Sequence, residues 1–263
     1  MAEYINGKLQ LPNVTLVAMT SVNVRATYLA MKYSMKDIDF GDAVLITHRR
    51  PLTLPWKIRY SHTKELTNIN DFNYKMVYEL TDHIKTDYAL IVHADGFVVN
   101  PKMWRDEFLD YDYVGAPWPL PPSDNPVLYR AADGTVSRVG NSAGIRSKRL
   151  LDYPKVNNIP WEGYIENGQQ YFHEDIFLCC HLKPEMEKVG IKIAPIDVAK
   201  YYAHEHAIDE VKGITPFAFH KWWGANDIYP DFTKTDYLCK LETFMMRVKR
   251  KLRRTFLKKY KEA

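Results

Sequence analysis

The sequence has few cysteines and no long apolar run. Its three cysteines (Cys179, Cys180 and Cys239) lie outside any CxxC motif and are too few for a disulfide framework. The longest apolar runs, such as residues 88–92, are far too short to cross a bilayer. The first 13 residues also lack the apolar core of a signal peptide. We therefore expect a cytoplasmic protein that folds without disulfides.

The composition is that of an ordinary globular protein, with 46% hydrophobic and 26% charged residues. It excludes an intrinsically disordered chain and a collagen-like chain. The formal net charge of +4 is unevenly distributed, because residues 240–263 contain 10 basic residues and 2 acidic ones. The rest of the chain holds 26 basic and 30 acidic residues. This asymmetry predicts an anionic partner for the C-terminal segment alone.

Hydrophobic periodicity predicts alternating strands and helices in the first part of the chain. Residues 14–20, 43–47 and 88–92 are apolar or β-branched runs typical of buried strands. Residues 24–35 and 70–84 carry apolar side chains at helical spacing. The alternation favours an α/β sheet flanked by crossover helices.

The second part of the chain is less regular. Prolines in residues 117–122 predict an irregular loop that continues to residues 133–134. We expect a short helix over residues 176–182 and a short strand over residues 192–196. A helix is expected from residue 236 onward.

Four short motifs contain residues suited to chemistry, and each has a structural alternative. His93, Ala94 and Asp95 follow a buried strand, where open α/β sheets bind ligands, and Asp95 suits a metal-bound phosphate. The alternative is a simple Asp-Gly turn. Gly140, Asn141 and Ser142 form a small-residue loop that would admit a ligand close to the backbone. The alternative is a flexible connector.

The other two motifs contain acidic residues and a histidine. Glu174 and Asp175 precede a predicted helix, where a carboxylate can act as a general base. Helix capping is the alternative explanation for both. His220 lies between aromatic residues and can complete a metal site or serve as a hydrogen-bonded structural residue.

Taken in order, these motifs resemble a bacterial family of glycosyltransferases with the GT-A fold, long described as a domain of unknown function. The resemblance rests on residues 86–97, 110–118, 140–147, 174–177 and 216–220, and it covers roughly residues 12–225. It implies a GT-A-like, Rossmann-type mixed sheet in residues 1–235, followed by a basic amphipathic helix in residues 236–263. In place of the common Asp-x-Asp metal motif, this chain has His93 and Asp95.

The resemblance implies a metal-dependent, inverting transfer of a hexose from a nucleotide diphosphate sugar, with UDP as the default nucleotide. The acceptor would be a hydroxyl of a bacterial surface glycan, such as a capsule, O-antigen or lipooligosaccharide precursor. Mn²⁺ or Mg²⁺ would be held by Asp95 and His220, with His93 beside them. Asp175 would act as the base, and Glu174 would hold the acceptor or orient Asp175.

Further residues are assigned to the two substrates. The expected donor-binding residues are Thr20, Ser21, Asn23, Arg25, Lys75, Ala94 and Asp95. The expected acceptor or sugar-binding residues are Trp118, Gly140, Asn141, Ser142 and Trp223, and Trp161 is a further stacking candidate. Burial in the core is the competing explanation for each tryptophan.

Two other classes of function remain open. A nucleotidyltransferase would usually carry a glycine-rich loop after its first strand, and residues 20–23 contain no glycine. A non-catalytic, membrane-associated sugar-binding scaffold would not need Asp95, Asp175 and His220.

The C-terminal helix is expected to be amphipathic. Its apolar residues recur three or four apart, and basic residues fill the other face: the apolar set is Tyr237, Leu241, Phe244, Met245, Val248, Leu252 and Phe256. This pattern favours a helix at an anionic membrane surface. Docking on the body of the protein and nucleic-acid binding are the alternatives, and the acidic body argues against nucleic acid.

Overall fold

The computed structural model describes residues 2–122, 129–131, 133–161, 164–166, 169–171 and 173–261. Among the described residues, seven strands form one mixed sheet in the order β4-β3-β2-β5-β8-β7, with β1 paired to β2. These strands are β1 (Tyr4–Ile5), β2 (Lys8–Met19), β3 (Ile38–Thr47), β4 (Arg59–His62), β5 (Tyr88–Ile91), β7 (Tyr113–Pro117) and β8 (Val139–Ser147). The protein is therefore α/β, as predicted.

Strand direction changes across the sheet. β2, β3, β4 and β5 are parallel, whereas β8 runs antiparallel to both β5 and β7. From β2 the chain moves outward to β3 and β4 on one side, and it returns to β5 on the other side of β2. The carboxyl ends of β2 and β5 therefore flank a point where strand order reverses, which is where open α/β sheets bind ligands.

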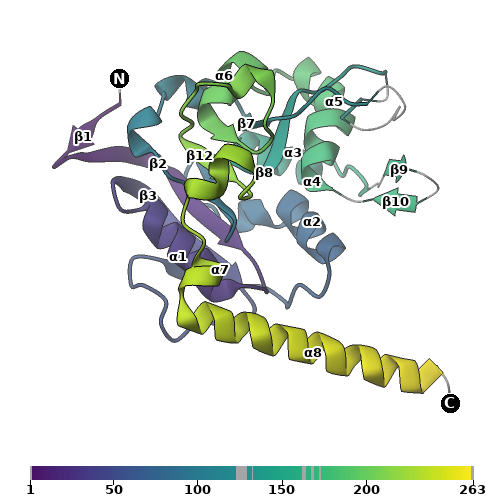
Figure 1. Cartoon of the computed structure of the whole chain (residues 1–263). Coiled ribbons are helices and arrows are strands. Elements are labelled where there is room, and N and C mark those ends of the chain that lie inside the picture. Colours follow the sequence, from purple (N-terminus) through teal and green to yellow (C-terminus); the bar gives the residue numbers. More distant parts are fainter. Residues whose placement is uncertain are drawn as a thin grey trace.

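Helices cover both faces of the sheet (Figure 1). They are α1 (Val24–Ser34), α2 (Ile69–Tyr78), α3 (Lys148–Val156), α4 (Glu174–Ile176), α5 (Lys183–Lys188) and α6 (Ile196–Tyr202). Leu16 and Ala18 of β2 pack in the core that contains α1 and α6, while Val17 and Met19 pack with α2, α3 and α5. Because alternate side chains enter opposite cores, the strand reads as a continuous apolar run.

A smaller sheet lies beside the main one. Its strands are β6 (Gly96–Val98), β11 (Ala203–His204) and β12 (Ala218–His220), in the order β11-β12-β6. β12 pairs antiparallel with β6, so His220 lies opposite Gly96. A short hairpin of β9 (Tyr164–Glu166) and β10 (Gln169–Tyr171) completes the described strands. The small sheet was not expected from the sequence.

The chain ends in α7 (Phe232–Thr235) and α8 (Tyr237–Lys261). Figure 1 shows α8 as a long arm that starts below α1 and projects away from the body. In the part of the chain that the structure describes, no helix is both long and apolar enough to cross a membrane.

Three predicted elements differ from the structure. Residues 140–144 belong to strand β8 and are not a loop. The predicted strand over residues 192–196 is reduced to one bridge between Ile193 and Tyr113, since α6 already begins at Ile196. The helix predicted over residues 70–84 ends as an α-helix at Tyr78 and continues as a 3₁₀ turn. Part of the loop predicted after residue 117 lies outside the described residues.

Candidate functional site

A cavity of about 740 Å³ opens at the carboxyl ends of β2 and β5. Residues from both sheets and from α2, α4 and α8 line it. The predicted site residues that reach it are Thr20, Ser21, Asn23, His93, Ala94, Asp95, Asn141, Glu174, Asp175 and His220. The structure thus brings most of the predicted residues, from five separate segments, to one cavity.

Asp95 and His220 meet across the pairing of β6 with β12. Asp95 Oδ1 lies 3.9 Å from His220 Nε2, and the Asp95 side chain is 42% exposed. The imidazole comes this close because residue 96 is glycine: a Cβ there would lie 2.6 Å from His220 Cδ2. The pairing register of β6 with β12, and the glycine at position 96, therefore place the Asp95 carboxylate and the His220 imidazole side by side.

Glu205, which follows β11, supports His220 from behind. Its buried carboxylate accepts a hydrogen bond from Lys221 Nζ at 2.6 Å, and its Oε1 lies 3.3 Å from His220 Nδ1. Burial raises the pKa of Glu205, but the contacts with His220 and Lys221 outweigh this and lower it to about 2. Glu205 is therefore a carboxylate at neutral pH.

Two tautomers of His220 fit these contacts. With hydrogen on Nδ1, the ring donates to Glu205; with hydrogen on Nε2, Nδ1 accepts from Asn141 Nδ2 at 2.8 Å. Only the first tautomer leaves an Nε2 lone pair facing Asp95. A carboxylate behind an imidazole is the usual arrangement around histidines that bind metals.

Asp95 and His220 could supply two ligands to a divalent cation. Two bonds of about 2.1 Å can join donor atoms up to about 4.2 Å apart, and the observed 3.9 Å lies within that range. Oxygen and imidazole donors together suit Mn²⁺. Among the described residues, however, no cluster of three or more His, Cys, Asp or Glu side chains could hold a metal. The pair fits a cation whose remaining ligands come from a substrate or water.

His93 lies next to this pair, with its ring centroid 5.8 Å from that of His220. Burial, and then the charge of His220, lower the pKa of His93 to about 4. His93 is therefore neutral at physiological pH and forms a polar wall of the cavity.

Glu174 and Asp175 begin α4, and their surroundings differ. Glu174 is buried and accepts a hydrogen bond from Arg146 Nη2 of β8 at 2.9 Å. The Asp175 carboxyl lines the cavity and accepts from the backbone N–H of Ile176 at 2.9 Å. Burial, and then the charge of Glu174, raise the pKa of Asp175 to about 7. Asp175 is thus poised to exchange a proton near neutral pH.

The small residues of β8 act through packing. A Cβ at Gly140 would lie 1.9 Å from the Trp118 ring, so Gly140 lets the buried indole cross the strand. At the register shift opposite residues 114–116, Asn141 adopts a left-handed conformation with φ of 86°. This bulge directs the Asn141 amide to Glu205, with which it forms a hydrogen bond. The Ser142 side chain lies outside the part that the structure describes.

Some predicted substrate-binding residues lie outside the cavity lining. Trp118 is buried and stacks on Tyr129, so it is a core residue and not a surface for stacking a sugar. Arg25 is paired with Asp236, and Lys75 is paired with Glu79, the residue after the end of α2.

Two further tryptophans also lie outside the lining. Trp161 packs against Phe177, and the half-exposed Trp223 lies under the ammonium of Lys221. With Gly140, these residues take no part in the site as the structure forms it.

Sequence reasoning missed Glu205 and Arg146. Glu205 lies between His204 and His206, and this His-Glu-His triplet was the available signal. Arg146 is fully buried, and nothing in the sequence around it distinguishes it from a surface arginine. Both act by fixing residues that line the cavity.

Comparison with known proteins gives a family and no activity. Residues 56–220 match a family described as "protein of unknown function" (DUF5672). The matched stretch begins before α2 and ends at His220, so it includes Asp95, Asp175 and Glu205. No curated protein matches the chain.

Proposed function

We propose that this chain, which belongs to the DUF5672 family, is a metal-dependent glycosyltransferase. It would move a sugar from a nucleotide diphosphate sugar, with UDP as the expected nucleotide, to an acceptor hydroxyl. One observation carries the proposal: a single cavity contains polar residues at the end of the first long strand, an Asp–His pair and a carboxyl with a pKa near 7. These parts match the needs of donor binding, leaving-group stabilisation and proton removal.

The donor would lie across the ends of β2 and β5. Thr20, Ser21 and Asn23 line that part of the cavity and offer hydroxyl and amide groups to a nucleoside. Ser21 is held in place, because its Oγ accepts from Leu66 N at 2.9 Å and lies 3.1 Å from His48 Nδ1. The rigid end of the strand therefore positions the polar groups.

Asp95 and His220 would hold Mn²⁺ or Mg²⁺ against the donor diphosphate, with Glu205 fixing the His220 ring. A cation bound there supplies positive charge to the leaving diphosphate. Asp95 is open to the cavity, so phosphate oxygens and water can complete the ligand set.

Asp175 would take the proton of the attacking hydroxyl. Its raised pKa makes the carboxylate a better proton acceptor than an exposed aspartate while leaving about half of it ionised at pH 7. Glu174 is engaged by Arg146 and so positions Asp175 through the start of α4. Attack assisted by one base, without a covalent intermediate, inverts the configuration of the sugar.

Exchange of Asp175 for Asn tests this assignment. We expect Asp175→Asn to abolish transfer in a panel of nucleotide sugars, and UDP binding with Mn²⁺ by calorimetry to stay within about twofold. Glu185→Gln, an exposed carboxylate of α5, is the matched control and should keep full activity. Full turnover of Asp175→Asn would remove Asp175 as the base.

Two further outcomes would contradict the proposal more broadly. Full activity in excess chelator would exclude the cation. Binding of UDP with no turnover of any sugar donor would favour the sugar-binding scaffold instead, and binding of ATP in preference to UDP would favour a nucleotidyltransferase.

The proposal extends to the cellular location. We place the enzyme at the inner face of the cytoplasmic membrane, where a lipid-linked glycan acceptor is available. The support is the described part of α8, in which Tyr237, Leu241, Phe244 and Met245 are exposed although they share one side of the helix. Such a row beside basic residues fits an anionic bilayer surface.

A further inference from the structure

The loop between β3 and β4 presents apolar side chains to solvent. Leu52 is fully exposed and Trp56 is 89% exposed. Arg49, Arg50 and Lys57 surround them and are exposed as well, and residues 49–58 contain no acidic residue. A tryptophan and a leucine at the tip of a basic loop are costly to leave in water.

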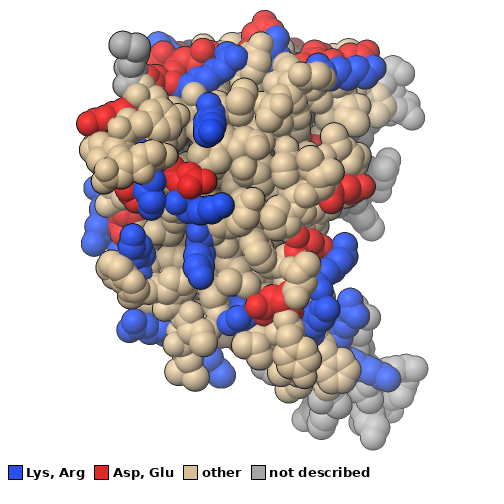
Figure 2. Space-filling view, turned by 60° about the vertical axis from the view of Figure 1, so that its left-hand side comes forward, with Lys and Arg blue, Asp and Glu red and all other residues tan. Residues whose placement is uncertain are grey.

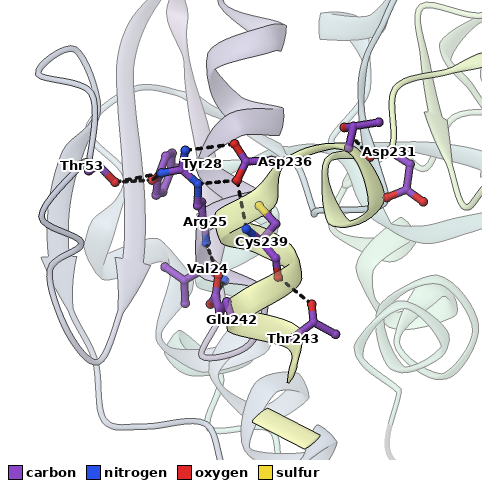
Figure 3. Close-up of polar contacts among 10 residues, drawn as sticks. Val24, Arg25, Tyr28, Thr53, Asp231, Asp236, Cys239, Glu242 and Thr243 are labelled. Atoms are coloured by element: carbon purple, nitrogen blue, oxygen red, sulfur yellow. Dashed lines mark hydrogen bonds and ion pairs between the residues drawn. The ribbon is translucent and has the colours of Figure 1, made fainter. Parts of the chain in front are cut away.

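This loop is connected to the start of α8 through one arginine. Arg25 Nε donates to Asp236 Oδ1 at 2.7 Å, and its Nη1 donates to Thr53 Oγ1 at 3.2 Å. Figure 3 shows Thr53 and Asp236 approaching Arg25 from opposite sides. The loop and the helix are therefore held in a fixed relation by a side chain that both contact.

The acidic groups at the start of α8 are turned toward the body. Asp236 pairs with Arg25, and both oxygens of the Glu242 carboxylate accept from the backbone N–H groups of Val24 and Arg25, at 2.8 and 3.1 Å. Cys239 is buried on the same side of the helix. The side of the helix that faces solvent is thus left with apolar and basic residues in the described part.

The two segments lie on the same side of the molecule. In Figure 1 the loop after β3 descends beside the start of α8. Figure 2 shows blue and tan side chains, with few red ones, along the lower edge of the molecule. This edge of the molecule therefore carries mainly basic and uncharged residues.

We propose that residues 49–57 and the exposed face of α8 form one composite surface that docks on an anionic lipid bilayer. This inference rests on the membrane location proposed above and adds a second, chain-distant anchor to it. A bilayer fits better than a folded partner because the apolar groups are isolated tips among basic residues, which suits insertion between lipid headgroups. Thr243 of α8 also lines the cavity, so docking would place the cavity beside the bilayer.

Vesicle binding by the full-length protein tests the composite surface. The vesicles contain 30% phosphatidylserine, and the variant is Leu52→Glu/Trp56→Glu. We expect its apparent Kd to rise at least tenfold over that of the unchanged protein. Leu120→Glu/Val156→Glu exchanges two exposed apolar residues elsewhere and should bind like the unchanged protein. Because all four side chains are exposed, urea unfolding should show that each variant stays folded.

Tryptophan fluorescence identifies which tryptophan enters the bilayer. Binding should shift tryptophan emission to shorter wavelength, and Trp56→Phe should remove most of that shift while retaining most of the affinity. If the shift comes from the exposed Trp223 and not from Trp56, the loop does not enter the bilayer as proposed.

The outcomes separate this inference from the proposals beneath it. If the unchanged protein binds and Leu52→Glu/Trp56→Glu binds equally well, the composite surface is wrong and α8 alone remains the anchor. If the unchanged protein does not bind anionic vesicles, both the composite surface and the membrane location are wrong. Neither result bears on sugar transfer to a soluble acceptor, which is measured separately.

Discussion

Replacement of Glu205 by Gln is the most direct test of the electrostatics of the site. The carboxylate is 6% exposed and contacts Lys221 and His220 at 2.6 and 3.3 Å. Glutamine has the same shape and no charge, so it represents the protonated form of the glutamate. The difference in stability between the two proteins therefore estimates the value of the charge itself.

The lowered pKa sets the magnitude. A fall from the ordinary 4.5 to about 2 corresponds to about 3 kcal/mol of unfolding free energy at pH 7. Because the pKa is lowered in the folded protein, this stabilisation is complete above about pH 5 and is lost as the pH falls toward 2. At pH 3 it should have decreased to about 1 kcal/mol.

Urea unfolding at pH 7 and at pH 3 measures both quantities. We expect Glu205→Gln to unfold about 3 kcal/mol more easily at pH 7, with a smaller difference in acid. Glu210→Gln is the matched control: Glu210 also forms an ion pair, with Arg138 at 2.6 Å, but at the surface, so its exchange should have no measurable effect. A difference below about 1 kcal/mol at pH 7, equal in size at pH 3, would refute the reasoning.

Two other predictions concern the same region. The rate of transfer should increase with pH through about 7 as Asp175 ionises. Glu174→Gln should move this increase to lower pH, because it removes a neighbouring negative charge that raises the pKa of Asp175. A pH–rate profile that is flat between 5 and 8 would contradict the role of Asp175 as the base. Gly140→Ala should destabilise the fold by about 2 kcal/mol, because the added methyl group would meet the Trp118 ring. Adding Trp118→Leu should recover part of that loss in thermal unfolding, whereas simple additivity of the two changes would count against the clash.

The strands and helices were predicted from hydrophobic periodicity. The prediction was most accurate for strands that are buried on both faces of the sheet. Residues 14–20, 43–47 and 88–92 lie in strands or at their ends because a strand buried on both faces needs apolar residues throughout. The segment over residues 140–144 was misjudged for a physical reason. Glycine is typical of loops, but here it is required by the indole that crosses the strand, and that contact comes from a residue 22 positions away.

The candidate site was predictable where a motif lies next to a strand. Asp95 comes four residues after the end of β5, so the strand places it near the carboxyl edge of the sheet. Arg25 was assigned to the donor from its position after the first strand, yet its guanidinium is occupied by Asp236 of the C-terminal segment. Glu205 was missed because it contacts His220 only when β11, β12 and β6 pair in the small sheet. The local His-Glu-His triplet marks the residue, but it does not show that His220 and Lys221 will lie beside it.

The capping of α1 has a consequence for the order in which the protein can mature. Asn23, the residue before the helix, makes no side-chain cap, and Glu242 satisfies the first N–H groups instead. The two partners are about 218 positions apart, so a chain emerging from the ribosome must hold α1 incomplete until nearly all of it has been made. Loss of the C-terminal segment would return the finished protein to that state.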